Sequence, residues 1–170
     1  MNFKENKGIT LVALTITIIV LLIIAGIAIY SGNDIIKNAK LESLKTNMLL
    51  IQAKAKEYCE EASFKLGTNP TDDTKVTAKS YLDNTGAQDN DDYSKDKADL
   101  NVNDNENEYF YFLSSENLKK MGINGVESDD KNGRYYVKYN LTDVTVEVYN
   151  TKGFTKDSKT YRSLTELQEL

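Results

Sequence analysis

Residues 9–30 read ITLVALTITIIVLLIIAGIAIY, a run of 22 residues without a charged side chain. As an α-helix the run would be about 33 Å long, close to the hydrocarbon thickness of a bilayer. Its polar side chains are threonines, whose hydroxyls can bond to the carbonyl one turn earlier. Soluble core helices seldom stay uncharged on every face over this length, so the run predicts a membrane-spanning helix rather than a buried core helix.

The eight residues before the run, MNFKENKG, contain two lysines and one glutamate and end at Gly8. A basic start followed by an apolar run is typical of a secretory signal peptide. This run is too long for an ordinary signal peptide, and no A-x-A-type cleavage site follows it. We therefore expect the run to remain as an anchor. Lys4 and Lys7 favour a cytoplasmic N-terminus, which places the rest of the chain outside the cell.

Residues 33–66 predict a second helical segment, which is amphipathic. Gly67 and Pro70 predict its end, and residues 31–34 (SGND) predict a bend or an interruption before it. Four apolar residues run together at positions 48–51, so we expect that turn to be covered on all sides. Other apolar residues form a heptad stripe, which we expect to pack on a sheet rather than in a free coiled coil. The stripe consists of Leu41, Leu44, Met48, Ile51, Ala55, Tyr58 and Ala62.

Residues 67–108 contain 11 acidic and 4 basic residues, while the whole chain has a net charge of −5. Because so few of them are apolar, this segment predicts a long acidic surface loop. We expect at most one short anchored turn in it, formed by Val76, Ala78, Tyr81 and Leu82.

Calcium binding is an alternative for the end of this segment. Asp99, Asn101 and Asn103 have the alternating start of a calcium loop. The sixth position is Asp104 instead of Gly, and the twelfth is Phe110 instead of Glu. The spacing therefore disfavours a calcium site.

Residues 109–170 predict an antiparallel sheet with short helices. Strands are expected at residues 109–113, 134–140, 145–150 and 159–162. A serine-capped helix is expected at 114–121, a turn at 128–133 and a capped last turn at 163–170. The fold predicted from this order is α+β. A long N-terminal helix, with a membrane half at residues 9–31 and an amphipathic half at residues 33–66, packs on a small antiparallel sheet.

The composition excludes most catalytic and metal chemistry. With no His and one Cys, the chain has no Ser/His or Cys/His nucleophile pair, no His-ligated metal and no intrachain disulfide. We expect no enzyme, no catalytic residue and no cofactor. The negative net charge disfavours nucleic acid as a partner. Cys59 is interpreted as a small buried side chain rather than a reactive thiol or an intermolecular disulfide.

The N-terminal sequence resembles that of type IV pilins and pseudopilins. The resemblance rests on Gly8, on an apolar first residue at Ile9, and on Thr10, Leu11 and the aliphatic stretch that runs to Gly26 and beyond. It covers roughly the first 30 residues and is similar to pilin-like proteins of Gram-positive, clostridia-type bacteria. In that family a prepilin peptidase removes the leader on the cytoplasmic side and methylates the new N-terminus.

The resemblance implies cleavage after Gly8, which makes residues 1–8 a leader peptide, and N-methylation of Ile9. An assembly platform with its ATPase would then draw the helix, including Thr10, Leu11 and Gly26, from the membrane into a filament or secretion pseudopilus. The implied partners are other copies of this chain or other pilin-like subunits.

Two positions depart from the family pattern. The fifth mature residue is usually Glu, but here it is Ala13, and Tyr30 stands where many pilins have a helix-kinking Pro. A Glu in lipid costs roughly 2.5 kcal/mol or more unless it is paired, so it gives assembly a direction that Ala13 does not supply. This departure implies a minor, tip or initiating subunit, a processed protein that does not polymerise, or a different way of registering subunits.

An alternative function is an uncleaved single-pass membrane protein with an extracellular binding module. The pilin-like hypothesis predicts a mature N-terminus at Ile9. The binding-module hypothesis predicts that Met1 or Asn2 is retained.

Overall fold

The computed structural model describes residues 6–83, 92–103, 105 and 107–170, with side chains described at 16–22 and, within these ranges, from residue 35 onward. The chain divides into two compact units, Met1–Lys40 and Leu41–Leu170. The second unit combines helices with a four-stranded antiparallel sheet in the order β1-β2-β3-β4. This arrangement confirms the predicted α+β class.

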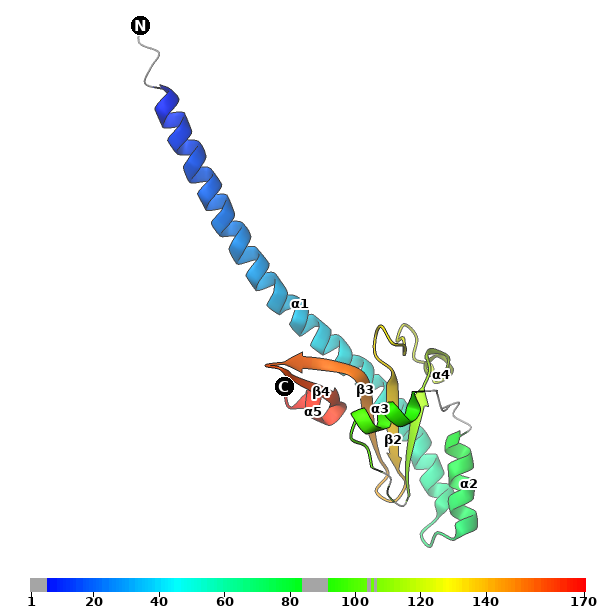
Figure 1. Cartoon of the computed structure of the whole chain (residues 1–170). Helices are drawn as coiled ribbons and strands as arrows, with labels where there is room; N and C mark the ends of the chain where they lie inside the picture. Colours follow the sequence, from blue (N-terminus) through cyan, green and yellow to red (C-terminus); the bar gives the residue numbers. More distant parts are fainter. Residues whose placement is uncertain (1–5, 84–91, 104, 106) are drawn as a thin grey trace. The chain divides into compact units, whose positions relative to one another are not determined.

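Helix α1, Asn6–Leu66, contributes to both units (Figure 1). Its helical backbone passes through residues 31–34, so the interruption predicted there is wrong. A single Gly32 inside a helix lowers stability by only about 1 kcal/mol, which long flanking helical segments can offset. Gly67 follows the last turn with φ +76°, and its N–H donates to the carbonyl of Ser63 at 3.2 Å. The left-handed conformation favours glycine and ends the helix, as predicted.

The predicted stripe of α1 faces the sheet in the second unit. Met48, Ile51, Ala55 and Ala62 are fully buried, Leu41 is 8% exposed, and Leu44 and Tyr58 are partly buried against the same core. The expectation that the turn at 48–51 is covered on all sides is wrong, because Leu49 and Leu50 are 44% and 50% exposed. Both residues lie off the stripe, on the side of α1 that no sheet covers.

The four strands follow the predicted order, and each begins within one residue of its predicted start. They are β1 Glu108–Leu113, β2 Tyr135–Asn140, β3 Thr145–Lys156 and β4 Lys159–Ser163. Strand β3 runs six residues past its predicted end, because a register shift between Tyr149 and Phe154 lets its second half pair with β4. Such a bulge bends a strand without ending it.

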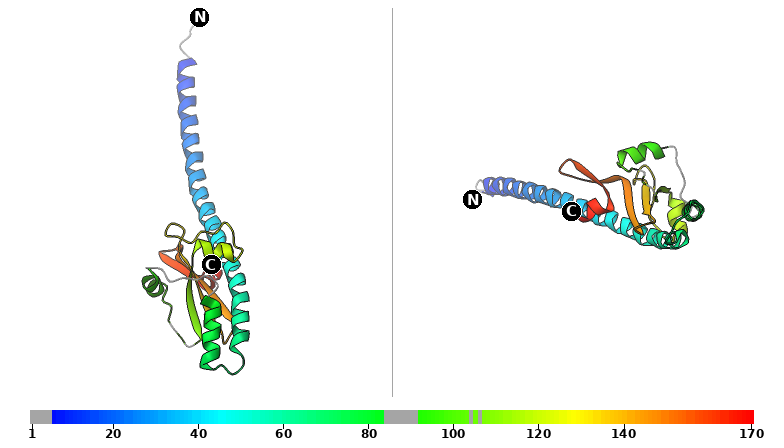
Figure 2. Two further views of the ribbon diagram at one scale, coloured as in Figure 1. Left: turned by 90° about the vertical axis from the view of Figure 1, so that its right-hand side faces the viewer. Right: turned by 90° about the horizontal axis from the view of Figure 1, so that it is seen from below.

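The sheet is covered on both faces because its side chains alternate. Val137, Tyr139 and Val148 point into the larger core with α1. Phe110 and Tyr136 point to the other face, where they form a second core with Leu100, Val102 and partly buried aromatic residues. Figure 2 shows α1 and α3 on opposite sides of the sheet. The chain therefore builds a helix–sheet–helix arrangement in this unit.

The acidic segment is not a plain loop, which corrects the prediction for residues 67–108. It contains helices α2, Asp72–Asp83, and α3, Tyr93–Asp99. Two aspartates in the first turn of α2 favour the helix by interacting with its dipole. Ala78 and Leu82 are fully buried in the α1 core, whereas Val76 is 64% exposed. Tyr81, the remaining residue of the short turn expected from the sequence, is partly buried against the same core.

Two short helices are each fixed by a capping box. Ser114 caps α4, Ser115–Lys120, with Asn117 as its reciprocal partner. Ser163 caps α5, Leu164–Gln168, with Glu166 as its partner. Leu164 and other apolar residues of these helices are buried in the larger core. Both helices lie where the serine signals predicted them.

Candidate assembly surfaces

The first candidate surface is the part of α1 formed by residues 16–22, which we call the apolar collar. These seven consecutive residues make about two helical turns, so they point in every direction around the axis. All are exposed, and six are large apolar side chains. Their exposed fractions lie between 46% for Val20 and 68% for Leu22. An apolar surface on all sides of a helix is stable when lipid or protein covers it.

The site residues predicted from the sequence lie in the same helix. Gly8, Ile9, Thr10, Leu11 and Ala13 have helical backbone near the start of α1, and so has Gly26 farther along. Their side chains lie outside the described residues. Ile35 and Ile36, on the other side of that gap, are 67% and 54% exposed. Among the residues that the structure describes, no helix is long and apolar enough to cross a membrane.

The second unit carries a protruding aromatic side chain, which we call the Phe64 knob. Phe64 is 89% exposed, more than any other large apolar side chain among the described residues. Glu57, Glu60, Glu61 and Lys65 surround it. Glu57 pairs with Lys54, so Glu60 and Glu61 against Lys65 leave one net negative charge beside Phe64. Phe64 comes two residues after the buried Ala62, so it leaves the stripe and points away from the core.

A groove on the same unit, which we call the Leu50 groove, lies between α1 and the loop after α4. Leu50 forms its apolar side on α1, and Ile123 lies opposite in the loop. Lys54 lines it too and pairs with Glu57 at 3.1 Å. The full lining is Leu50, Ala53, Lys54, Glu57, Gly122, Ile123 and Asn124.

The knob and the groove lie on one face of α1. Leu50, Ala53, Glu57 and Phe64 follow one another at intervals of three, four and seven residues, which places them on one side of a helix. This side is opposite to the buried stripe. The sequence patterns did not predict this face, although the apolar residues at positions 49, 50 and 64, which lie off the stripe, indicate it.

Helix α3 is attached to the sheet by a buried ion pair. Arg134 donates through Nε and Nη2 to the two carboxylate oxygens of Asp96 at 2.6 and 2.7 Å. The hydroxyl of Tyr136 donates to the same carboxylate at 2.7 Å, and Asp96 is only 3% exposed. Burial tends to raise the pKa of Asp96, but the hydrogen bonds from Arg134 and Tyr136 outweigh it, so this pKa is lowered. Asp92 and Asp130 also contact Arg134.

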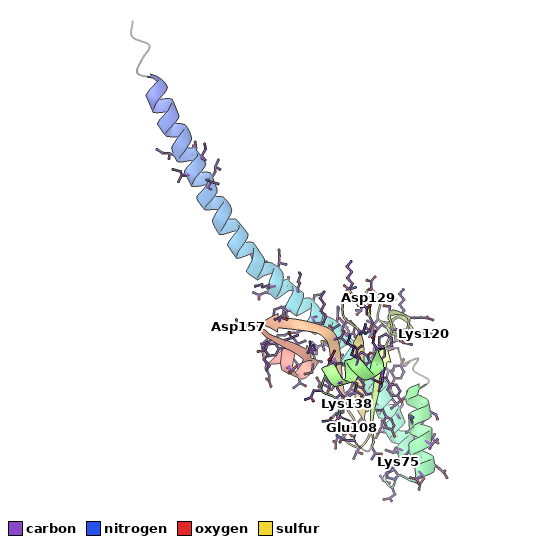
Figure 3. The ribbon with its side chains drawn as sticks, in the orientation of Figure 1. Lys75, Glu108, Lys120, Asp129, Lys138 and Asp157 are labelled. Carbon is purple, nitrogen blue, oxygen red and sulfur yellow. The ribbon has the colours of Figure 1, made fainter. Side chains whose placement is uncertain are left out.

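A second ion pair lies on the same face of the sheet. Lys138 Nζ lies 2.9 Å from a carboxylate oxygen of Glu108, and both residues are labelled in Figure 3. Burial tends to raise the pKa of Glu108, but the hydrogen bonds from Lys138 and Asn105 lower it overall. With a lowered pKa this carboxylate is ionised at neutral pH, so the pair stabilises the sheet and offers no proton donor.

The remaining candidate groups do not form a reactive site. Cys59 is fully buried, and its thiol donates to the carbonyl of Asn140 at 3.4 Å. Burial raises the pKa of this thiol to about 11, which confirms its interpretation as a small buried side chain. Asp99 is the last residue of α3. In the described part of the chain, no cluster of three or more His, Cys, Asp or Glu side chains could hold a metal ion.

Comparisons with protein-family models, curated proteins and solved structures found no match to this chain.

Proposed function

We propose that this chain is a structural subunit, minor or atypical, of a type IV pilus-like filament or a secretion pseudopilus. The observation that carries the proposal is the apolar collar, with six large apolar side chains exposed on all sides of one helix. Lipid tails and neighbouring apolar helices solvate such a surface about equally well, so a helix of this kind can move between a membrane and a bundle of like helices.

The sequence around the collar supports the same proposal. Residues 9–30 carry no charge, and Lys7 and Gly8 precede them as in a prepilin leader. We infer that a prepilin peptidase cuts after Gly8 and methylates Ile9. Before assembly the protein remains in the membrane as a single-pass subunit, with its N-terminus in the cytoplasm and its second unit outside the cell. The assembly platform and its ATPase draw it into a surface filament.

The proposed fold is pilin-like, with α1 serving both units. Its first half is the anchor and assembly element, and its second half, from Leu41, is the spine on which the sheet packs. Ala13 gives the assembly helix no buried charge with which to select a register. Additional contacts between second units would therefore help to define how neighbouring copies meet.

The test places charges on the collar. In the cells that produce the protein, Leu21→Lys/Leu22→Lys is compared with the wild type by separating sheared surface filaments from membranes. A lysine at the centre of a lipid-covered helix costs about 2.5–3.5 kcal/mol, so two should remove the protein from filaments and lower its membrane content. Val76→Lys is the matched control, because Val76 is 64% exposed but lies on α2.

Wild-type distribution of the double-lysine variant would contradict the proposal, because the collar would then need no apolar cover. Wild-type protein that stays in the membrane fraction with Met1 or Asn2 retained would instead favour the uncleaved binding module.

A further inference from the structure

We propose that Asn124 is a site of spontaneous covalent modification, at which its side-chain amide is lost as ammonia and an aspartate or isoaspartate is formed. The site lies in the loop between α4 and β2, and the inference does not depend on the proposed function. The sequence contains two Asn-Gly pairs, Asn124-Gly125 and Asn132-Gly133. A glycine after an asparagine has no side chain that hinders this reaction, so the surroundings of each pair decide whether it occurs.

The reaction needs only the chain itself and water. The main-chain nitrogen of Gly125 attacks the side-chain carbonyl carbon of Asn124, and the new carbon–nitrogen bond closes a five-membered succinimide ring. The side-chain nitrogen leaves as ammonia, which in balance carries away the proton of the attacking amide. Water then adds to one of the two ring carbonyls and opens the ring. One carbonyl gives aspartate and the other gives isoaspartate, in which the main chain runs through the former side chain.

The Asn124-Gly125 pair is the exposed tip of its loop. Both residues are exposed and belong to neither a helix nor a strand. In the part of the chain that the structure describes, no hydrogen bond engages the side chain of Asn124 or the N–H of Gly125. Gly125 has φ +83°, and no atom lies within 4 Å of the position that a Cβ would take. The two reacting groups are therefore free to approach each other.

The second pair is held by its surroundings. The side-chain nitrogen of Asn132 donates to Glu127 at 3.1 Å and to Asp129 at 3.2 Å. Its main-chain N–H donates to the other carboxylate oxygen of Asp129 at 2.7 Å. Gly133 forms a β-bridge with Asp129 and packs closely against the buried side chain of Asn150. These contacts must open before a succinimide ring can close at this pair.

The modification would change both the loop and the surface beside it. Ile123 and Val126, on either side of the pair, are each 6% exposed and pack in the larger core. Isoaspartate adds one carbon atom to the main chain between these two anchors. Either product also adds a carboxylate to the lining of the Leu50 groove, where Lys54 already pairs with Glu57. The lining, which is neutral before the reaction, would become negative.

The test follows both pairs in the full-length protein, folded in detergent micelles at mildly alkaline pH. Samples taken over time are digested after glutamate at mildly acidic pH, where ring closure is slow. This cleavage places Asn124 in peptide 117–127 and Asn132 in peptide 128–147. Mass spectrometry detects the replacement of the amide group by a hydroxyl and locates it by fragmentation, and chromatography separates the aspartate and isoaspartate forms.

We expect Asn124 to convert at least about tenfold faster than Asn132 in the folded protein, because the second pair must first break its side-chain hydrogen bonds. In urea both pairs lose their surroundings and should convert at similar rates. Equal rates in the folded protein, or faster conversion of Asn132, would overturn the inference. Conversion of Asn124 in urea but not in the folded protein would overturn it too.

Two variants test the chemistry and the geometry separately. Asn124→Gln keeps the amide but requires a six-membered ring, which closes more slowly, so position 124 should stay unmodified; conversion at the same rate would contradict the succinimide route. Because this side chain is exposed and unpartnered in the described structure, the variant should fold as the wild type does. Asp129→Ala should speed the conversion of Asn132 about two- to tenfold and leave Asn124 unchanged. An unchanged rate at Asn132 would overturn the inference that its hydrogen bonds distinguish the two pairs.

Discussion

Removing the carboxylate of Asp96 should release α3 from the sheet and destabilise the second unit. Asp96 is 3% exposed and accepts hydrogen bonds from two nitrogens of Arg134 and from the hydroxyl of Tyr136. In Asp96→Ala these donors lose their partner in a site that water hardly reaches. The lost contacts join a residue of the acidic segment to Tyr136 of β2 and to Arg134, which directly precedes β2, so the effect reports on the tertiary anchoring of that segment.

The size of the effect follows from what remains around Arg134. Breaking a buried ion pair by removing one partner costs about 3–5 kcal/mol. The side chain of Arg134 is 16% exposed and keeps Asp92 at 3.4 Å and Asp130 in contact. These carboxylates retain part of the charge balance, so we expect a loss of about 3 kcal/mol, at the lower end of that range.

The assay is urea unfolding of the full-length protein in detergent micelles, followed by near-ultraviolet circular dichroism of its 11 tyrosines. Asp99→Ala is the control, because Asp99 is exposed at the end of the same helix and should change the free energy of unfolding by less than about 0.5 kcal/mol. An Asp96→Ala variant as stable as Asp99→Ala would refute the reasoning. It would mean that water replaces the ion pair without any loss of stability.

Three further predictions concern the pH dependence of stability, two glycines with positive φ, and the reactivity of the Cys59 thiol. In the folded state the pKa values of Asp96 and Glu166 lie below their ordinary values of 3.8 and 4.5. Above these ordinary values the two carboxylates contribute fully to stability, and the contribution is lost as the pH falls through their lowered folded-state pKa values. Urea midpoints measured from pH 7 to pH 2 should therefore fall below about pH 4.5, and Asp96→Asn should fall less steeply; a flat profile would contradict this. Gly133→Ala should lower the free energy of unfolding by more than about 2 kcal/mol, because φ is +92° and the new Cβ would overlap the side-chain amide of Asn150, which is buried. Gly67→Ala, with φ +76° and open space around it, should lose only about 1 kcal/mol, and equal losses for both glycines would show that the close contact has no effect. Cys59 should react with a water-soluble thiol reagent only after unfolding in urea, and rapid labelling of the native protein would mean that its cover opens readily.

The parts of the fold that short-range signals determine were predictable from the sequence. Ser114 and Gly122 bracket α4, and the alternation around Val146 and Val148 marks β3. The stripe of α1 was predictable because its spacing follows the helix period whichever partner covers it. Each of these features depends on residues that are neighbours along the chain or along one helix.

The helices of the acidic segment were not predictable in the same way. Helix α2 depends on Ala78 and Leu82 packing against α1, and α3 depends on Asp96, whose partner Arg134 is 38 residues away. The composition indicated a polar loop, because it does not distinguish an aspartate that is buried in an ion pair from one that is exposed to water. Only tertiary contacts distinguish the two.

The candidate surfaces were also predictable only in the features that depend on residues close together in the sequence. The apolar run that contains the collar is visible in the sequence, although whether its residues are covered or exposed is not. The exposure of Leu50 and Phe64 was missed because apolar residues beside a buried stripe usually share its cover. The loop that places Ile123 opposite Leu50 comes from distant parts of the chain, so spacing alone does not reveal the groove.

The most direct test of the proposed function is the mass and N-terminal sequence of the protein isolated from the membranes of the cells that produce it. The proposal predicts a mature chain that begins at N-methylated Ile9 and lacks the first eight residues. An intact N-terminus at Met1 or Asn2 would contradict prepilin processing, and with it the assembly mechanism proposed for this chain.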